Sequence, residues 1–211
     1  LWNLVQLANA IYPLIEDKTP LEQALGLYTG GFDQGYLAMM RKKLGLQTAE
    51  ETDVELFESL EKLLQAEETD MTIFYRRLAD LDIRKTLDES AEDKAVIECV
   101  HESFYNDPGA GHIGPLASWF RQYAARLESE HSDTQERKRT MSEANPKYVL
   151  RNYLAQQAID KAETGDYSMI YELEAVLKRP YDEQPENEKY FAKRPEWART
   201  KAGCSMLSCS S

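Results

Sequence analysis

Apolar residues recur along this chain three to four positions apart, and no stretch of useful length alternates apolar with polar residues as a half-buried strand does. The pattern therefore predicts an all-α protein. A first helix is expected over 1–16, and it is apolar on most of its sides, which indicates burial against more than one neighbour. Because the chain begins inside this pattern without a methionine, we expect a preceding part; processing of a precursor is the milder alternative.

Helix start and stop signals divide the next part of the chain. Segment 19–22 reads Thr-Pro-Leu-Glu, a capping box with proline in the first turn, and predicts a helix start. We expect an interruption at the Gly-Gly pair 30–31, where two helices around a kink and one continuous helix are both open, and an end at Gly45. Overlapping capping boxes in 48–55 and the Thr-Asp pair 69–70 predict two further helices with apolar inner faces.

Regular spacing then fades. Over 82–93 the charge density rises and a loop is expected, followed by a helix over about 91–105. Segment 106–115 holds three glycines and two prolines and is the clearest break in the chain. A helix with its apolar face around Trp119 should follow. The polar run 128–140 is typical of a solvated helix face or a connector.

The sharpest helix signal begins at Asn145, which can cap a helix, with Pro146 in the first helical position. The predicted inner face comprises Leu150, Tyr153, Leu154 and Ala158. Gly165 is expected to end this helix in the left-handed conformation, and Ser168 to cap one more. Segment 180–211 holds three prolines and four large aromatic residues, so we expect an extended tail held by aromatic anchors.

Composition narrows the possible partners. The 211 residues are enough for a hydrophobic core, and 25 basic against 37 acidic residues give a net charge of -12. Such a charge repels nucleic acid and anionic membranes, so neither is expected as a partner. No apolar run approaches the ~20 residues that span a bilayer. Three cysteines are too few for a secreted disulfide scaffold, which favours a reducing, intracellular compartment.

Several short motifs could indicate a metal site, a catalytic base or a nucleotide site, but each indicates it only weakly. Two Glu-x-x-His pairs, 98–101 and 128–131, have the spacing of di-iron bundles, but 37 acidic residues make chance pairs common and surface side chains are favoured. His112 could act as a general base, yet no nucleophile lies near it by any motif, so a turn histidine is favoured. The glycines of 109–114 match a dinucleotide-binding motif but follow a helix instead of a strand.

Arg151 and Asn152 are polar positions inside the predicted helix. Arg151 could hold an anion, but a structural arginine paired with an acid or a carbonyl is favoured. Cys209 lies third from the end and Cys204 five positions earlier, so either thiol could form a reversible disulfide with a distant partner. A chance pair in a small-residue terminus is the alternative. Cys99 is expected on a buried helix face.

Blocks along almost the whole chain occur in the same order in one known family. They are Leu1-Trp-Asn-Leu4, Pro13-Leu-Ile15, Lys43-Leu-Gly-Leu46, Phe74-Tyr-Arg-Arg-Leu78, Trp119-Phe-Arg-Gln-Tyr123, Arg126-Leu127, Asn145 to Gln157, Arg179-Pro-Tyr181, Pro195-Glu-Trp197 and Cys209-Ser-Ser211. On these blocks the chain resembles the selenoprotein O family, the kinase-like protein adenylyltransferases. The resemblance implies a pseudokinase-like fold that transfers AMP from ATP, with magnesium or manganese, to Ser, Thr or Tyr hydroxyls of proteins.

In that family the ATP-binding and metal-binding groups precede the Leu-Trp-Asn-Leu block, which here is residue 1. The resemblance therefore implies a C-terminal helical lobe or extension with an extended tail. No catalytic, cofactor or metal residue is expected in this segment, and alone it should be inactive. ATP and Mg or Mn would belong to the full-length protein. The upstream kinase-like lobe of the same chain is the expected partner, with protein substrates for the full-length form.

The resemblance also assigns residue roles. Cys209 corresponds to the family's C-terminal cysteine, thought to form a redox-regulatory disulfide with a cysteine upstream. Trp2, Asn145, Arg151 and Asn152 are expected to be structural. A bacterial member would be cytoplasmic and a eukaryotic one mitochondrial. A non-catalytic helical interaction module and a metal-dependent bundle enzyme are the alternatives.

Together these features predict four regions. They are 1–105, continuing the kinase-like C-lobe; 106–144, a Gly/Pro loop, helix and polar connector; 145–179, a helical pair; and 180–211, an extended tail with the terminal cysteine.

Overall fold

A computed structural model describes residues 1–15, 17–131, 133–201 and 204. These residues form α-helices and 3-10 helices, and their one pairing of extended backbone is an isolated bridge between Thr69 and Phe104. The all-α prediction is thereby confirmed for the described part. Contacts within the chain define two compact units, Leu1–Arg41 and Lys42–Ser211. The predicted four-part division stays a prediction.

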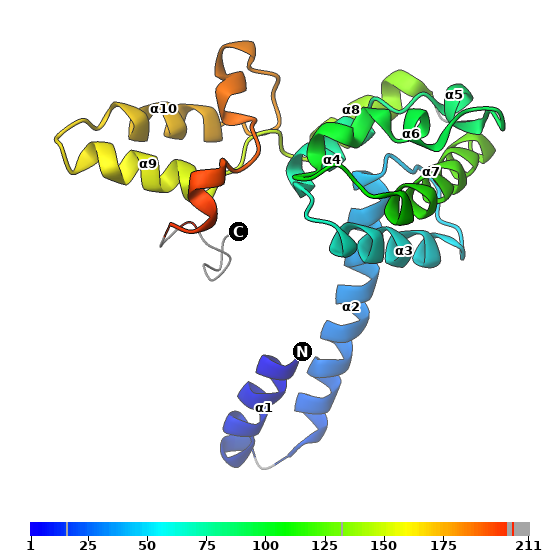
Figure 1. Ribbon diagram of the computed structural model, residues 1–211. Helices are drawn as coiled ribbons and strands as arrows, with labels where there is room; N and C mark the ends of the chain where they lie inside the picture. The colour runs from blue at the N-terminus through cyan, green and yellow to red at the C-terminus, as the bar shows by residue number, and fades with distance from the viewer. Residues whose placement is uncertain (16, 132, 202–203, 205–211) are drawn as a thin grey trace. The chain divides into compact units, whose positions relative to one another are not determined.

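The first unit is a pair of helices, α1 (Trp2–Ile15) and most of α2 (Thr19–Lys43), with α1 folded back beside the first part of α2 (Figure 1). Of the two alternatives for 30–31, the structure shows the single helix: α2 runs through both glycines, and the interruption is absent. Glycine weakens a helix by about 1 kcal/mol without breaking it.

α1 contains no buried residue, although all of it is described. Trp2 is 72% exposed and Leu14 84%. Large apolar side chains on both helices are exposed with them: Leu1, Leu7, Tyr12, Ile15, Leu27, Tyr28 and Phe32. The burial predicted for this helix is therefore not supplied by the described residues.

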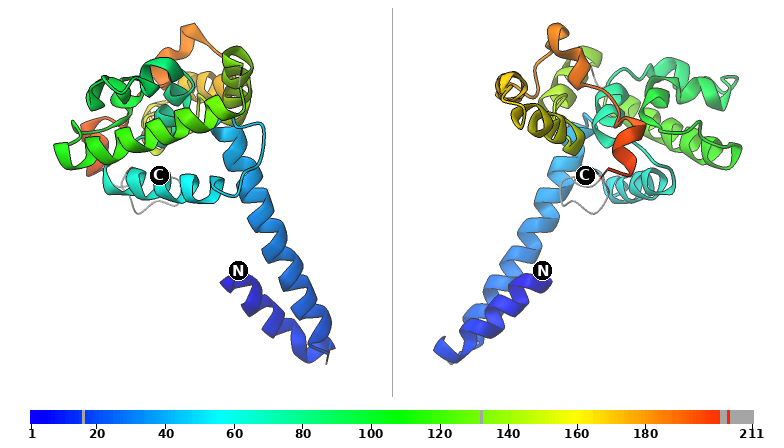
Figure 2. Two further views of the ribbon diagram at one scale, coloured as in Figure 1. Left: turned by 90° about the vertical axis from the view of Figure 1, so that its right-hand side faces the viewer. Right: turned by 60° about the vertical axis from the view of Figure 1, so that its left-hand side comes forward.

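The second unit begins with a group of helices around α7. Its elements are α3 (Asp53–Ala66), α4 (Met71–Leu78), α5 (Ile83–Leu87), α6 (Asp93–Val96), the 3-10 helix η1 (Glu98–Ser103), α7 (Ala110–Ser129) and α8 (Thr134–Ala144). Helix α7 packs against α3, α5 and α6, as the two views of Figure 2 also show. It buries Trp119, Phe120 and Tyr123 almost completely.

Three predictions in this part need correction. The loop expected over 82–93 contains α5, and the helix expected over 91–105 is instead α6 followed by a 3-10 helix. The predicted break at 106–115 ends early, because α7 begins at Ala110 and holds Pro115 inside it. Proline removes one helix hydrogen bond there. The burial of the apolar face that follows it outweighs this loss.

The last part of the unit pairs α9 (Asn152–Ala162) with α10 (Ser168–Leu177), side by side in Figure 1. Two 3-10 helices follow, η2 (Pro185–Tyr190) and η3 (Glu196–Arg199), so the described tail is partly helical. Tyr190 and Phe191 lie in one apolar cluster with residues of α9 and α10.

The helix predicted to begin at Asn145 begins instead at Asn152, which is a correction. Asn145 is the C-cap of α8, and its side-chain Nδ2 donates to the carbonyls of Lys43 and Met141, each at 2.9 Å. An asparagine can cap the end of the preceding helix as readily as the start of the following one. Here the hydrogen bond to the distant Lys43 carbonyl favours the position at the end of α8. Leu150, expected to face inward, is 51% exposed.

The helix ends predicted at Gly45 and Gly165 and the helix start predicted after 69–70 are confirmed, whereas the cap predicted at Ser168 is not. Gly45 and Gly165 follow helices with φ of 67° and 86°, the left-handed region that favours glycine. Asp70 caps α4, its carboxylate accepting from the Ile73 amide at 3.1 Å. Ser168 is the first residue of α10 and not its cap, since Asp166 accepts from its amide. Among the described residues, no helix is long and apolar enough to cross a membrane.

Candidate functional site

A cavity of about 690 Å³ lies where the start of α4, the segment before α9 and the tail meet. It is lined by Glu68, Thr69, Asp70, Met71, Thr72, Tyr105, Val149, Leu150, Arg151, Asn152, Tyr153, Arg194 and Cys204. The cavity brings together two residues singled out in the sequence, Arg151 and Asn152, with the last described cysteine. It is therefore the candidate functional site.

An ion pair between Asp70 and Arg151 forms one wall of this cavity. Arg151 Nη2 donates to Asp70 Oδ1 at 2.9 Å and Nη1 donates to Oδ2, a bidentate arrangement. Asp70 is 4% exposed and the Arg151 side chain 13%. Burial opposes the charge of Arg151, but the hydrogen bonds and charge of Asp70 outweigh it and raise the pKa of the guanidinium. The guanidinium of Arg151 is thus paired with an acid of its own chain through both Nη atoms, whereas its buried Nε has no hydrogen-bond partner among the described residues.

The tail supplies a second ion pair to the same cavity. Arg194 donates to Glu68, which also pairs with Arg199, and the Arg194 guanidinium lies 5.2 Å from the centre of the Tyr105 ring. The Arg194 amide donates to the Tyr105 hydroxyl at 3.0 Å. Cys204 is 2% exposed and lines the cavity beside these residues. The charged groups of the cavity are consequently paired with one another.

Asn145 lies in a neighbouring polar cluster around Arg76. Arg76 Nη1 donates to the carbonyls of Ser142 at 3.1 Å, Asn145 at 3.0 Å and Tyr181 at 3.3 Å. Its Nη2 pairs with Glu183, which Lys147 also binds. These contacts tie the segment after α10 to α4 and to the end of α8.

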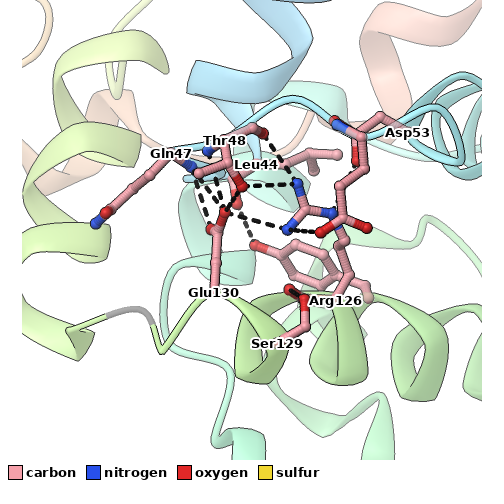
Figure 3. A network of polar contacts seen from close by, with 9 residues as sticks. Leu44, Gln47, Thr48, Asp53, Arg126, Ser129 and Glu130 are labelled. Carbon is pink, nitrogen blue, oxygen red and sulfur yellow. Dashed lines mark hydrogen bonds and ion pairs between the residues drawn. The ribbon is translucent and has the colours of Figure 1, made fainter.

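A third network centres on Arg126 of α7, which sequence analysis recognised only as part of a block (Figure 3). Its Nε donates to Asp53 Oδ1 at 2.9 Å, Nη1 to Glu130 Oε2 at 3.1 Å and Nη2 to the Thr48 carbonyl at 2.9 Å. Glu130 in turn accepts from two backbone amides. The Gln47 amide donates to Oε1 and the Thr48 amide to Oε2, each at 3.1 Å. The i,i+4 spacing of Arg126 and Glu130 was the available signal.

The side chains in this third network are nearly all buried: Arg126 is 7% exposed, Asp53 2% and Glu130 4%. Burial opposes the charge of Arg126, but the hydrogen bonds that it donates to Asp53 and Glu130, together with their charges, outweigh burial and raise the pKa of the guanidinium. The network joins the loop after α2 to α3 and α7. Its role in the described chain is to hold these elements together.

The remaining candidates lie apart from these clusters. His101 pairs with Asp107 at 3.1 Å, whereas His131 lines a different cavity beside α5 and α8. His112, predicted in a turn, is buried in the first turn of α7, where its ring meets Phe104 edge-on at 6.0 Å. Burial raises the pKa of the Cys99 thiol to about 12.

One predicted residue lies in the first unit, and another lies outside the described part of the chain. Trp2 is exposed on α1, in the first unit. Cys209 lies outside the described residues. In the part of the chain that the structure describes, no three metal-ligating side chains gather to hold an ion.

In the described residues the fold is all-α, and the acids and bases of these three clusters pair with one another. A family model described as "Protein adenylyltransferase SelO" matches residues 1–178, and the chain belongs to this family. The resemblance found in the sequence is thereby confirmed.

Curated relatives of the chain support the same family assignment. The chain is 50% identical over 212 residues to the "Protein nucleotidyltransferase YdiU" of Flavobacterium johnsoniae and 46% over 217 residues to that of Rhodopirellula baltica. It is 44% identical over 211 residues to that of Aromatoleum aromaticum. Each alignment covers 100% of this chain but only 40%, 40% and 39% of the relative. The chain spans about two fifths of their length.

Proposed function

We propose that this chain is the C-terminal helical part of a protein adenylyltransferase, which supports a kinase-like catalytic lobe and carries Cys209 as a redox-regulatory residue. The whole protein would transfer AMP from ATP, with Mg or Mn, to Ser, Thr or Tyr hydroxyls of other proteins. The ATP and metal sites would lie outside this chain. Membership of the family and the partial coverage of its relatives support the proposal.

The observation that carries the supporting role is the apolar surface of α1. A helix that exposes Trp2 at 72%, Leu7 at 53% and Leu14 at 84% leaves an apolar surface that water solvates poorly. In the proposal this surface is covered by the catalytic lobe. The ion pairs around Arg76, Arg126 and Arg151 in the second unit fit the same role, because they hold its elements together as a support requires.

The test is incorporation of labelled AMP from ATP with Mg or Mn, under reducing and oxidising conditions. It compares this chain, the chain extended by the upstream part that its relatives possess, and the extended chain with Cys209→Ser. We expect transfer by the extended chain alone, changed by oxidation, and insensitive to oxidation after Cys209→Ser. Transfer by the isolated chain would refute the supporting role, and an unchanged redox response in Cys209→Ser would refute the regulatory one.

A second candidate function is that of a helical interaction module without catalytic duty. The same exposed residues of α1 favour it, since they would suit a separate protein equally well. The two functions differ in what covers α1. Absence of AMP transfer from the extended chain, together with a stable complex between α1 and another protein, would favour the module.

A further inference from the structure

A small cavity of about 230 Å³ lies between α4, α8 and the segment that follows α10. It is smaller than the roughly 300–1,000 Å³ of pockets that take drug-sized ligands, so it suits a small ion. Four cationic and two acidic side chains line it: Arg76, Arg77, Lys138, Lys147, Asp80 and Glu183. In a chain with a net charge of -12, this wall carries an excess of positive charge, which attracts anions.

The cations and the acids of this wall differ in burial. The side chains of Arg76 and Lys147 are each 7% exposed, whereas those of Asp80 and Glu183 are 53% and 65% exposed. A buried cation needs a partner, because it has lost its water of hydration. An exposed carboxylate loses little when its ion pair opens, because water takes the place of the partner. The cavity therefore combines buried cations with acids that can leave.

Glu183 joins the two buried cations. Its Oε2 accepts from Lys147 Nζ at 2.6 Å, and its Oε1 accepts from Arg76 Nη2. One carboxylate thus places an oxygen on each cation, as a bound oxyanion would. Arg76 does not depend on Glu183 for its position, because its Nη1 donates to three backbone carbonyls. Lys147 keeps Glu188 as a second partner, so both cations stay in place when the Glu183 carboxylate leaves.

We propose that this cavity binds a doubly charged oxyanion of the phosphate class, which takes the place of the Glu183 carboxylate. Arginine and lysine are the usual protein partners of phosphate oxygens. A singly charged anion would only repeat the charge that Glu183 already supplies, whereas a dianion adds one. Its further oxygens are available to Lys138, whose side chain lines the same cavity and is 39% exposed. The proposal is independent of the AMP-transfer function proposed above.

Glu183 acts in this proposal as a tethered competitor. Because it belongs to the chain, its effective concentration at the cavity is high, and a free anion binds only the molecules whose site is open. If Glu183 occupies the site about nine-tenths of the time, the apparent affinity for the anion is lowered about tenfold. Glu183→Gln removes the competing charge and should therefore strengthen binding of the anion.

Isothermal titration calorimetry with inorganic phosphate tests the proposal on the full 211-residue chain. The titrations use about pH 8, where phosphate is mostly a dianion, and one fixed ionic strength, because salt screens such contacts. The matched control is Glu174→Gln on α10, which removes the same charge from a side chain of similar exposure, 57%, paired with Lys178. Adding Lys138→Gln to Glu183→Gln removes one cation of the wall.

We expect Glu183→Gln to tighten phosphate binding about tenfold and Glu174→Gln to leave it unchanged. Lys138→Gln in the Glu183→Gln background should weaken it again by about two- to fivefold, as for a partly exposed charge pair. Acetate, a monoanion, should bind the wild-type chain far more weakly than phosphate. O-phosphoserine, titrated in parallel, distinguishes a phosphate group carried by a larger molecule from free phosphate by which of the two binds more tightly.

Three results would each overturn the proposal. The first is absence of phosphate binding by the wild-type chain, a test that holds even if a variant fails to fold. The second is binding of acetate as tight as that of phosphate, since the site would then not select a dianion. The third is an equal effect of Glu174→Gln and Glu183→Gln, since the net charge of the chain and not this cavity would then govern binding.

Discussion

Replacing Arg126 with methionine tests how the second unit is held together. Methionine fills much of the same space but cannot pair with Asp53 and Glu130, whose side chains are 2% and 4% exposed. Two buried carboxylates would lose their cationic partner and keep only neutral donors, and the Thr48 carbonyl would lose the Arg126 Nη2 donor. Removing one partner of a buried ion pair typically costs about 3–5 kcal/mol, because the remaining charge stays desolvated.

The assay is urea unfolding at pH 7, followed by far-UV circular dichroism. With a slope of roughly 2–3 kcal/mol per molar urea, a loss of about 3–5 kcal/mol lowers the midpoint by roughly 1–2.5 M. The matched control is Arg139→Met, which removes an arginine that also pairs with two acids, Glu136 and Glu143, but is 60% exposed. Water and salt screen such a pair, so its midpoint should hardly move.

A third variant separates lost pairing from lost packing. Adding Asp53→Asn and Glu130→Gln to Arg126→Met removes both unpaired charges and should restore part of the midpoint. The reasoning would be refuted if Arg126→Met lowered the midpoint no more than Arg139→Met does. It would also be refuted if neutralising the two acids made the protein less stable still.

Three further predictions concern single sites. Gly45→Ala should destabilise the chain by about 1–2 kcal/mol in urea unfolding, since φ is 67° and a Cβ would lie 2.7 Å from a side-chain carbon of α8, whereas Gly35→Ala, with nothing within 4 Å, should not. Burial opposes the ionised form of Glu183, but its hydrogen bond and charge pairing with Lys147 lower its pKa below the ordinary value of a glutamate. The resulting stabilisation is present at neutral pH and is lost as the pH falls through the folded-state pKa, so Glu183→Gln should flatten this acid limb of the stability curve. With its thiol pKa near 12, Cys99 should react with iodoacetamide at pH 8 far more slowly in the folded chain than in urea, and equal rates would contradict its burial.

Local signals in the sequence were sufficient where one residue and its neighbours decide the structure. Helical spacing predicted the all-α fold. Gly45 and Gly165 were placed correctly because each adopts a backbone conformation that disfavours side chains. The Asp70 cap was found because its partner, the Ile73 amide, lies three residues away.

Contacts remote in the sequence account for most of what was missed. Asn145 closes α8 through Lys43, 102 residues away, and a capping signal does not say which helix it serves. Arg151 was expected to pair with an acid or a carbonyl, but Asp70, 81 residues distant, could not be named. The partnership of Arg126 with Asp53 spans 73 residues and was not foreseen.

Long helices also tolerate residues that usually end them. The pair 30–31 lies inside α2, and Pro115 lies inside α7. In α7 the apolar face that follows the proline is buried, and this burial outweighs one missing hydrogen bond. Such a balance depends on packing, which a pattern of single residues does not contain. The cavity around Arg151 was missed for the same reason.

The central claim is that this chain supports a catalytic part outside it. The most direct measurement uses the part of the Flavobacterium johnsoniae relative that this chain does not cover, expressed separately, and follows labelled AMP transfer with and without added chain. We predict that the chain raises transfer, that Trp2→Asp on α1 abolishes the rise, and that Tyr171→Asp, at a residue 68% exposed on α10, preserves it. Full transfer without the chain, or transfer by the chain alone, would contradict the account.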